Sequence, residues 1–165
     1  MKKYEKKFLV NKIPDIKCLQ PIIYERYFTY IGKQGQVRVQ RRGEKFEIES
    51  VFGTYKKKIL ITKDAFQELT KDCDKLIKRE NYLLSDNVKL KIYKGQYEGL
   101  CIVDIECKDY EDYCRFRKPD WLGAEITSTL LGKDGSIIQL SREEVFQTIK
   151  EIQKRESLHF EMSDI

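Results

Sequence analysis

The segment Lys3-Tyr4-Glu5-Lys6-Lys7-Phe8-Leu9-Val10 combines charged with aromatic and aliphatic side chains. The segments 37–40, 56–59, 88–92 and 103–107 also alternate charge with hydrocarbon. Because successive side chains of a strand point to opposite faces, each segment would have one aliphatic and one charged face. On an open sheet, the charged faces would be solvated. In a closed barrel they would line an interior too polar to be a core, which would hold water and an anion.

The size and composition of the chain predict a single folded domain over residues 1–165. A chain of 165 residues can bury a core without disulfides or metals, and a hydrophobic fraction of 41% argues against disorder. The formal net charge of +5 favours anionic partners without identifying one.

The cysteines and the N-terminal residues predict a reduced, cytoplasmic protein. The chain has 5 cysteines and 1 histidine, and no two cysteines have C-x-x-C spacing, so a zinc site is not expected. The cysteines are interpreted as small apolar residues. Residues 1–3 show no secretory signal, and no apolar run is long enough to span a membrane.

Alternating segments separated by turn residues predict a fold rich in strands. Glycines at positions 32, 35, 43, 53 and 95 separate several of these segments. The expected strands are 3–10, 22–31, 36–42, 45–52, 54–61, 79–84, 87–95, 99–107 and 124–127, with a further one at 137–139.

Three helices are expected between or after the strands. The first begins near Thr62 and carries Phe66, Leu69 and Cys73 on one side, and a short one lies near 109–116. The last, over 142–155, starts with a capping box in which Glu144 follows Ser141 by three positions. The elements predict an α+β protein with an antiparallel sheet or barrel and helices packed outside.

Several motifs in order resemble a known family. They are Lys3-Tyr4-Glu5-Lys6-Lys7 for its E-x-E-x-K strand, Tyr24-Glu25-Arg26-Tyr27-Phe28 for its second strand, Arg38-Val39-Gln40 with Gly43-Glu44-Lys45-Phe46 for its R-x-R hairpin, Val103-Asp104-Ile105-Glu106 for its late E-x-E strand, and 119–127 for P-x-W-x-G-x-E-V-T. By this set, which covers almost the whole chain, the sequence resembles a CYTH domain, or triphosphate tunnel metalloenzyme.

The resemblance implies a closed eight-stranded antiparallel β-barrel whose lumen binds triphosphate or a related polyphosphate. Members include inorganic, thiamine and RNA triphosphatases and class IV adenylyl cyclases. Their chemistry needs Lys and Arg for phosphate oxygens, and carboxylates for Mg²⁺ or Mn²⁺.

The basic residues that this chemistry needs are well represented. Lys7 and Arg38 match family positions, and Lys133 is a further candidate in a loop. The expected phosphate-binding residues are Lys7, Arg38, Lys56, Lys58, Arg79, Lys89 and Lys91.

The acidic residues are depleted. Lysine stands at the family's acidic positions 3, 56, 58 and 91, while Gln40 and Val51 replace basic residues. The remaining candidate metal ligands are Glu5, Asp104, Glu106 and Glu125, with Glu47 and Glu49 also candidates for the inward face. Each acid-to-lysine change disfavours a nearby Mg²⁺ and favours an anion.

The main hypothesis is therefore a CYTH-like protein that binds triphosphate, polyphosphate or a phosphorylated nucleotide, with catalysis weakened or lost. The alternative is an active Mg²⁺- or Mn²⁺-dependent triphosphatase, in which the acids hold the metal. If the protein is instead a pseudoenzyme, it would need no metal. A third possibility is a lumen filled by its own salt bridges, with Asp104 and Glu106 as partners of Lys89 and Lys91. A membrane or nucleic-acid partner is not expected.

Other polar and aromatic residues receive structural interpretations. Trp121 is expected to pack beside the barrel, and His159 to lie exposed in a polar tail without a role. The sequence identifies no catalytic residue and no oligomeric state.

Overall fold

The computed structural model describes residues 4–163, except for the side chains of Phe160 and Ser163. Lys3, which stands at the first acidic position of the N-terminal motif, lies outside the described residues.

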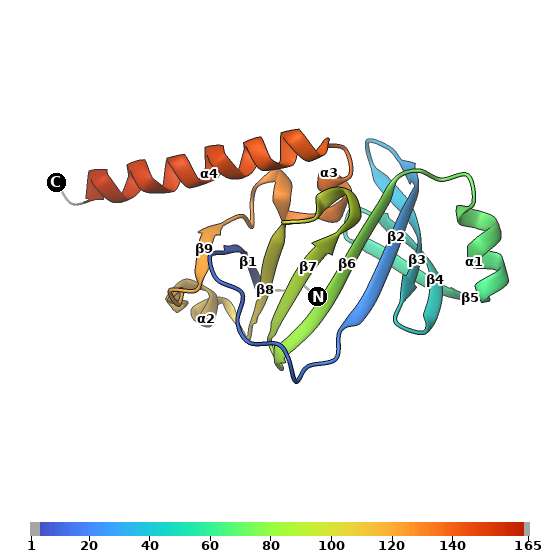
Figure 1. Ribbon diagram of the computed structural model, residues 1–165, viewed down its shortest axis with the longest axis horizontal. Helices are drawn as coiled ribbons and strands as arrows, with labels where there is room; N and C mark the ends of the chain where they lie inside the picture. The colour runs from blue at the N-terminus through green and yellow to red at the C-terminus, as the bar shows by residue number, and fades with distance from the viewer. Residues whose placement is uncertain (1–3, 164–165) are drawn as a thin grey trace.

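The described strands form one antiparallel sheet of nine strands, in the order β5-β4-β3-β2-β6-β7-β8-β1-β9 (Figure 1). The strands are β1 Tyr4–Val10, β2 Ile22–Ile31, β3 Gly35–Arg42, β4 Lys45–Phe52, β5 Tyr55–Ile61, β6 Leu76–Ser85, β7 Val88–Lys94, β8 Cys101–Cys107 and β9 Leu122–Glu125.

The expected α+β fold and antiparallel sheet are confirmed. The sheet has nine strands, whereas the family resemblance implies a barrel of eight. Among residues 4–163, no backbone ladder joins the edge strands β5 and β9, so hydrogen bonds do not close the sheet into a barrel. The expected strand at 137–139 is wrong, because the segment belongs to α3 and the turn after it. The buried pair Ile137 and Ile138 is compatible with either structure, so alternation could not distinguish them.

Tight glycine turns set the register of the hairpins β3–β4 and β4–β5. Gly43 and Gly53 each have a φ of 61°, a left-handed conformation that side chains with a Cβ rarely adopt. Each lies in a two-residue connection, which fixes the pairing of the flanking strands.

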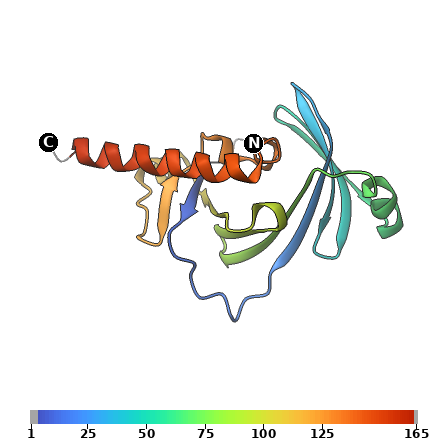
Figure 2. The same ribbon diagram turned by 45° about the horizontal axis from the view of Figure 1, so that its top comes forward.

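Helices lie at the two ends of the sheet and over its rim (Figures 1 and 2). They are α1 Lys63–Thr70, η1 Gly95–Tyr97, α2 Tyr110–Arg115, η2 Leu130–Gly132, α3 Asp134–Ile137 and α4 Arg142–Ser163. Helix α1 begins after Thr62, whose side chain accepts a hydrogen bond from the amide of Ala65. Phe66 packs against Tyr27 and Phe46, whereas Leu69, expected on the same buried side, is 48% exposed.

The hydrophobic core has two parts on opposite faces of the sheet. Leu9 and Ile102 belong to the part that α3, η2 and the first half of α4 cover. Phe8 and Val103, next to them in the chain, belong to the other part, against which Trp121 packs as expected. Alternation along each strand therefore supplies apolar residues to both faces at this end of the sheet.

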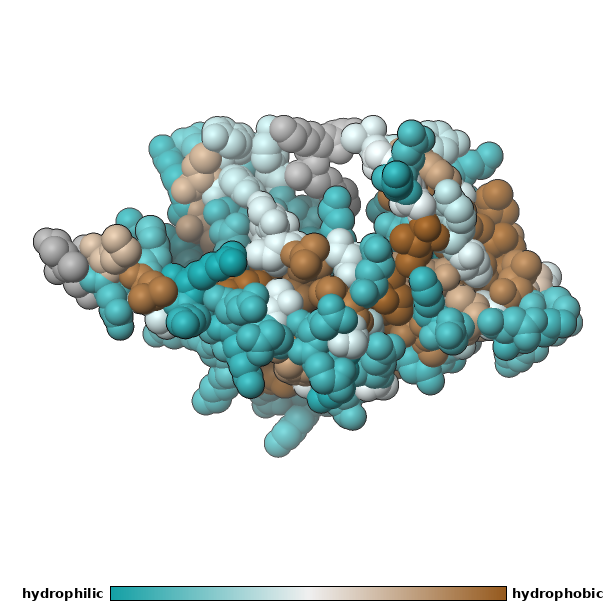
Figure 3. All heavy atoms as spheres, turned by 90° about the horizontal axis from the view of Figure 1, so that it is seen from above, coloured by the Kyte–Doolittle hydropathy of each residue, from teal (hydrophilic) through white to brown (hydrophobic). Residues whose placement is uncertain are grey.

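Helix α4 crosses one edge of the molecule and presents a mostly hydrophilic surface (Figure 3). Val145 is buried at its start, while most side chains after Ile152 are exposed, including His159. The helix is longer than the expected range 142–155.

The expected capping box at the start of α4 is present. The Ser141 hydroxyl accepts from the Glu144 amide, and the Glu144 carboxylate accepts from the Ser141 amide.

Replacing Ser141 by alanine is expected to lower the free energy of unfolding by about 1 kcal/mol, because one helical amide loses its acceptor. Urea unfolding of both proteins measures this change; equal midpoints and slopes would contradict it.

The described helices include none that is long and apolar enough to cross a membrane. The cysteines are all unpaired, and Cys18 and Cys114 are exposed rather than buried.

Candidate functional site

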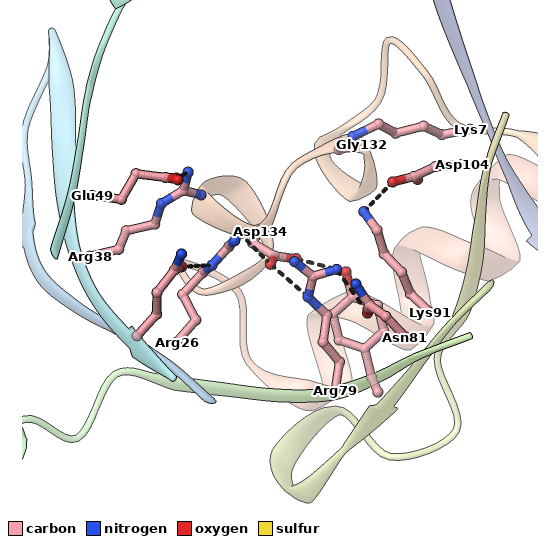
Figure 4. A network of polar contacts seen from close by, with 12 residues as sticks. Lys7, Arg26, Arg38, Glu49, Arg79, Asn81, Lys91, Asp104, Gly132 and Asp134 are labelled. Carbon is pink, nitrogen blue, oxygen red and sulfur yellow. Dashed lines mark hydrogen bonds and ion pairs between the residues drawn. The ribbon is translucent and has the colours of Figure 1, made fainter. Parts of the chain in front are cut away.

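The strand register brings the charged positions of separate segments onto one face of the sheet. Partners directly opposite in an antiparallel pair share a face. Lys7 pairs with Asp104, which pairs in turn with Lys89. On the other half of the sheet, Arg38 pairs with Glu49, which pairs with Lys58. Residues two positions apart on a strand lie on the same face, so these paired residues share one face of the sheet. The sheet curves around this face, which we call the concave face (Figure 4).

All seven predicted phosphate-binding residues lie on the concave face. They differ in depth: Arg38 and Arg79 are buried, whereas Lys56, Lys58 and Lys89 are exposed. Lys133 is also exposed, at the residue before α3. The strand register thus places these seven cations on one face, and their contact with phosphate stays a prediction.

Asp134, the first residue of α3, lies at the centre of the concave face between two arginines (Figure 4). Arg26 Nη1 donates to Asp134 Oδ2 at 2.9 Å, and Arg79 Nε lies 3.3 Å from the same oxygen. The Tyr93 hydroxyl donates to Oδ1 at 2.7 Å. The aromatic ring of Tyr24 lies under the Arg79 guanidinium, 4.5 Å from its central carbon. Asp134 thus accepts two hydrogen bonds and forms a further ion pair with Arg79, whose buried Nε has no hydrogen-bond partner among the described residues.

A second group of contacts surrounds Arg38 on β3. Its Nη2 donates to Glu49 Oε1, and Lys58 Nζ lies 3.3 Å from the other oxygen of Glu49. Nε of Arg38 is buried and has no hydrogen-bond partner among the described residues. A buried donor without an acceptor costs free energy, so a ligand oxygen here would be stabilising.

Gln40 connects the arginine cluster to β4. Its Oε1 accepts from Arg26 Nε at 2.8 Å, and its Nε2 donates to Glu47 Oε1 at 2.7 Å. Arg42 Nε also donates to Glu47, at 3.0 Å. Gln40 is fully buried and orients both a cation and an acid.

On the β1–β7–β8 side, lysines surround Asp104. Lys91 Nζ lies 2.5 Å from Asp104 Oδ2, while the buried Oδ1 has no hydrogen-bond partner among the described residues. Lys7 Nζ donates to the carbonyl of Gly132 at 2.7 Å, which ties β1 to the segment before α3. Asp104 therefore has a close lysine partner and two register-paired lysines.

Crowding of like charges changes the acid–base properties of the concave face. Burial and the Arg79 charge lower the pKa of Lys91 to about 8. Burial and the Arg26 charge lower the pKa of Arg38 to about 9. Burial alone would raise the pKa of Asp134, but Arg79 and Arg26 outweigh it and hold this pKa below its ordinary value. Burial therefore disfavours the charged forms of Lys91 and Arg38, although each contacts a carboxylate.

Lys91 makes stability depend on pH. Its folded pKa of about 8 lies below the ordinary 10.5, so above pH 8 the unfolded chain binds more protons. Stability should therefore rise with pH in this window. Between about pH 8 and about pH 9.5, we expect Lys91 to add about 1–2 kcal/mol to the free energy of unfolding. Urea unfolding of the parent and of Lys91→Met tests this: the parent should gain more than the variant, and equal gains would contradict the assignment.

Three of the four predicted metal ligands share the concave face. Glu5 and Glu106 are register partners, next to the Lys7–Asp104 pair. Their carboxylates are the hard oxygen donors that Mg²⁺ and Mn²⁺ prefer. A dication at Asp104 would approach several ammonium groups, which disfavours it, whereas the buried Oδ1 of Asp104 has an open acceptor position. Metal binding by Glu5, Asp104 and Glu106 stays a prediction.

Glu125 does not lie with the other three predicted ligands. It pairs with Phe8, across a register irregularity between β1 and β9, and contacts Lys6 at 3.5 Å. Both line a cavity of about 510 Å³, with apolar walls that include Phe116 and Ile152. Glu125 was expected among the metal ligands from the resemblance of residues 119–127, and the irregular pairing of β9 with β1 places it apart from the other three.

The sequence reasoning missed several residues of the site. Arg26 could have been found, because it lies two positions from Tyr24 and from Phe28 on one strand. Tyr93 likewise follows Lys91 by two positions. Asp134 offered no such signal, because it comes from a short helix outside the sheet.

Comparison with known proteins finds similarity in structure only. No model of a protein family matches the chain, and no curated protein sequence matches it. A crystal structure of the inorganic triphosphatase NE1496 superimposes with a TM-score of 0.72 and 19% identity, covering 85% of this chain and 96% of that one. Another crystal structure, of the hypothetical protein NE1496, gives 0.72 and 20%, covering 85% and 99%. The chain therefore has the fold of the CYTH, or triphosphate tunnel, proteins.

Proposed function

We propose that this protein binds a phosphate-containing small anion on the concave face without needing a metal ion, and that its triphosphatase chemistry is weakened or lost. The ligand class is triphosphate, polyphosphate or a phosphorylated nucleotide. Arg38, Arg79 and Lys91 would contact the phosphate oxygens from within the sheet, and Lys56, Lys58 and Lys89 would attract the anion at its rim.

The observation that carries the proposal is a pair of buried cations whose charged forms are disfavoured in the free protein. Burial first, and neighbouring cations second, lower the pKa of both Lys91 and Arg38, although Asp104 contacts the lysine and Glu49 the arginine. A bound anion would stabilise both charged forms, and Arg38 Nε, which has no hydrogen-bond partner among the described residues, supplies a ready donor.

The similar fold of a protein described as an inorganic triphosphatase supports a phosphate ligand. Fold alone does not fix function, so we infer the ligand from the charged residues of this chain. Lysines stand at positions 56, 58 and 91, where the family resemblance implies acids, and they favour binding over metal-dependent hydrolysis.

The alternative is an active Mg²⁺- or Mn²⁺-dependent triphosphatase. The facing pair Glu5 and Glu106, together with the name of the similar protein, favours it. A metal held there would neutralise phosphate charge, and Lys7 would hold the phosphate beside it. This alternative predicts that Glu5→Gln abolishes hydrolysis.

Isothermal titration with tripolyphosphate, with EDTA or with excess Mg²⁺, followed by a phosphate-release assay on the same samples, distinguishes the two. Saturable binding in EDTA without phosphate release is the expected result. Release that requires Mg²⁺ or Mn²⁺ and disappears in Glu5→Gln would establish the triphosphatase instead. No binding in either condition would refute both.

A further inference from the structure

We propose that Asp134 is a specificity-determining residue that occupies one phosphoryl position on the concave face, so that the site prefers pyrophosphate to tripolyphosphate. The inference rests on the proposed function and narrows its ligand class.

The surroundings of Asp134 are those expected for a bound phosphoryl group. Its carboxylate accepts from a guanidinium at 2.9 Å and from the Tyr93 hydroxyl at 2.7 Å, and the second guanidinium lies 3.3 Å away. Charge-assisted donors of this kind bind carboxylate and phosphate oxygens alike. Arg26 and Arg79 therefore already hold an anion that belongs to the chain.

Asp134 is fixed in place by the core and not by the site alone. The buried residues Leu131 and Ile137, on either side of it in the chain, belong to the apolar cluster under α4. The carbonyl of Gly132 accepts from Lys7 Nζ, which joins the same segment to β1. A ligand would displace this carboxylate only by disturbing packed apolar residues, so the position stays occupied when the ligand binds.

The carboxylate of Asp134 takes the place of one negative group of the ligand. Figure 4 shows it between Arg26 and Arg79, on the same side of the sheet as Arg38 and Lys91. Tripolyphosphate carries more negative charge than pyrophosphate, so its additional phosphoryl group would lie against the Asp134 carboxylate without a matching cation.

The test is titration of the parent and of Asp134→Asn with sodium pyrophosphate and with sodium tripolyphosphate, in EDTA. The parent should bind pyrophosphate at least as tightly as tripolyphosphate. In Asp134→Asn, the ratio of the two affinities should move about tenfold toward tripolyphosphate, since a negative charge beside the additional phosphoryl group is gone. Asp72→Asn, an equal change of charge at an exposed position after α1, should leave the ratio unchanged.

Two results would overturn the inference while leaving the proposed function intact. One is tighter binding of tripolyphosphate than of pyrophosphate by the parent, by a large factor. This result needs no variant, so it can be obtained even if Asp134→Asn does not fold. The other is a folded Asp134→Asn with an unchanged ratio. Absence of binding by the parent to either phosphate would overturn the proposed function itself, and the inference with it.

Discussion

Asp134→Ala is expected to lower the free energy of unfolding by about 3–5 kcal/mol, among the largest effects of any single substitution in this protein. The reason is that Arg26 and Arg79 would remain in the interior without their shared carboxylate, beside each other and under-neutralised. Tyr93 would also lose the acceptor of its hydroxyl proton. Urea unfolding at neutral pH measures the change.

Tyr93→Phe is the matched comparison for this prediction. It removes one donor to Asp134 but leaves the pairing with both arginines, so the free energy of unfolding should fall by about 1–3 kcal/mol. Addition of tripolyphosphate should restore part of the stability of Asp134→Ala, because the anion replaces the missing charge. A loss in Asp134→Ala no greater than that in Tyr93→Phe would contradict the central place given to this carboxylate.

Arg38→Gln is expected to weaken binding of phosphate anions about tenfold to a hundredfold. A buried arginine that contributes a charge-assisted hydrogen bond is worth about 1.5–3 kcal/mol, and no other residue replaces it on β3. Titration with pyrophosphate in EDTA measures the effect.

The control for Arg38→Gln is Arg117→Gln, an equal change of charge on an exposed loop. It should change the affinity little, because its charge is screened by solvent. Equal losses in the two variants would mean that net charge alone attracts the anion and that the concave face is not the binding site.

The sequence predicted the strands and the cations that share a face because both depend on period-two alternation. Alternation separates the charged from the aliphatic positions within each segment, while Lys7 and Arg38 were assigned to the lumen by the family resemblance. Two-residue glycine turns then set the pairing of β3 with β4 and of β4 with β5. These are local signals, and a strand carries them in its own residues.

The parts that could not be predicted depend on contacts between distant segments. Whether β5 meets β9 is decided by the curvature of the whole sheet, which no single strand encodes. The position of Glu125 apart from Glu5, Asp104 and Glu106 depends on the irregular pairing of β9 with β1. Asp134 reaches the arginines from α3 through the packing of η2 and α4, and its sequence context, Lys133 and Gly135, resembles an ordinary turn.

The most direct test of the concave face as an anion site is the number of protons taken up when pyrophosphate binds at about pH 8. Because the pKa of Lys91 in the free protein is about 8, a bound anion should raise it and make the lysine take up a proton. Calorimetry in two buffers of different ionisation enthalpy gives that number for the parent and for Lys91→Met. The account predicts about half a proton more for the parent than for the variant. Equal proton numbers in the two proteins, or no saturable binding by the parent, would contradict it.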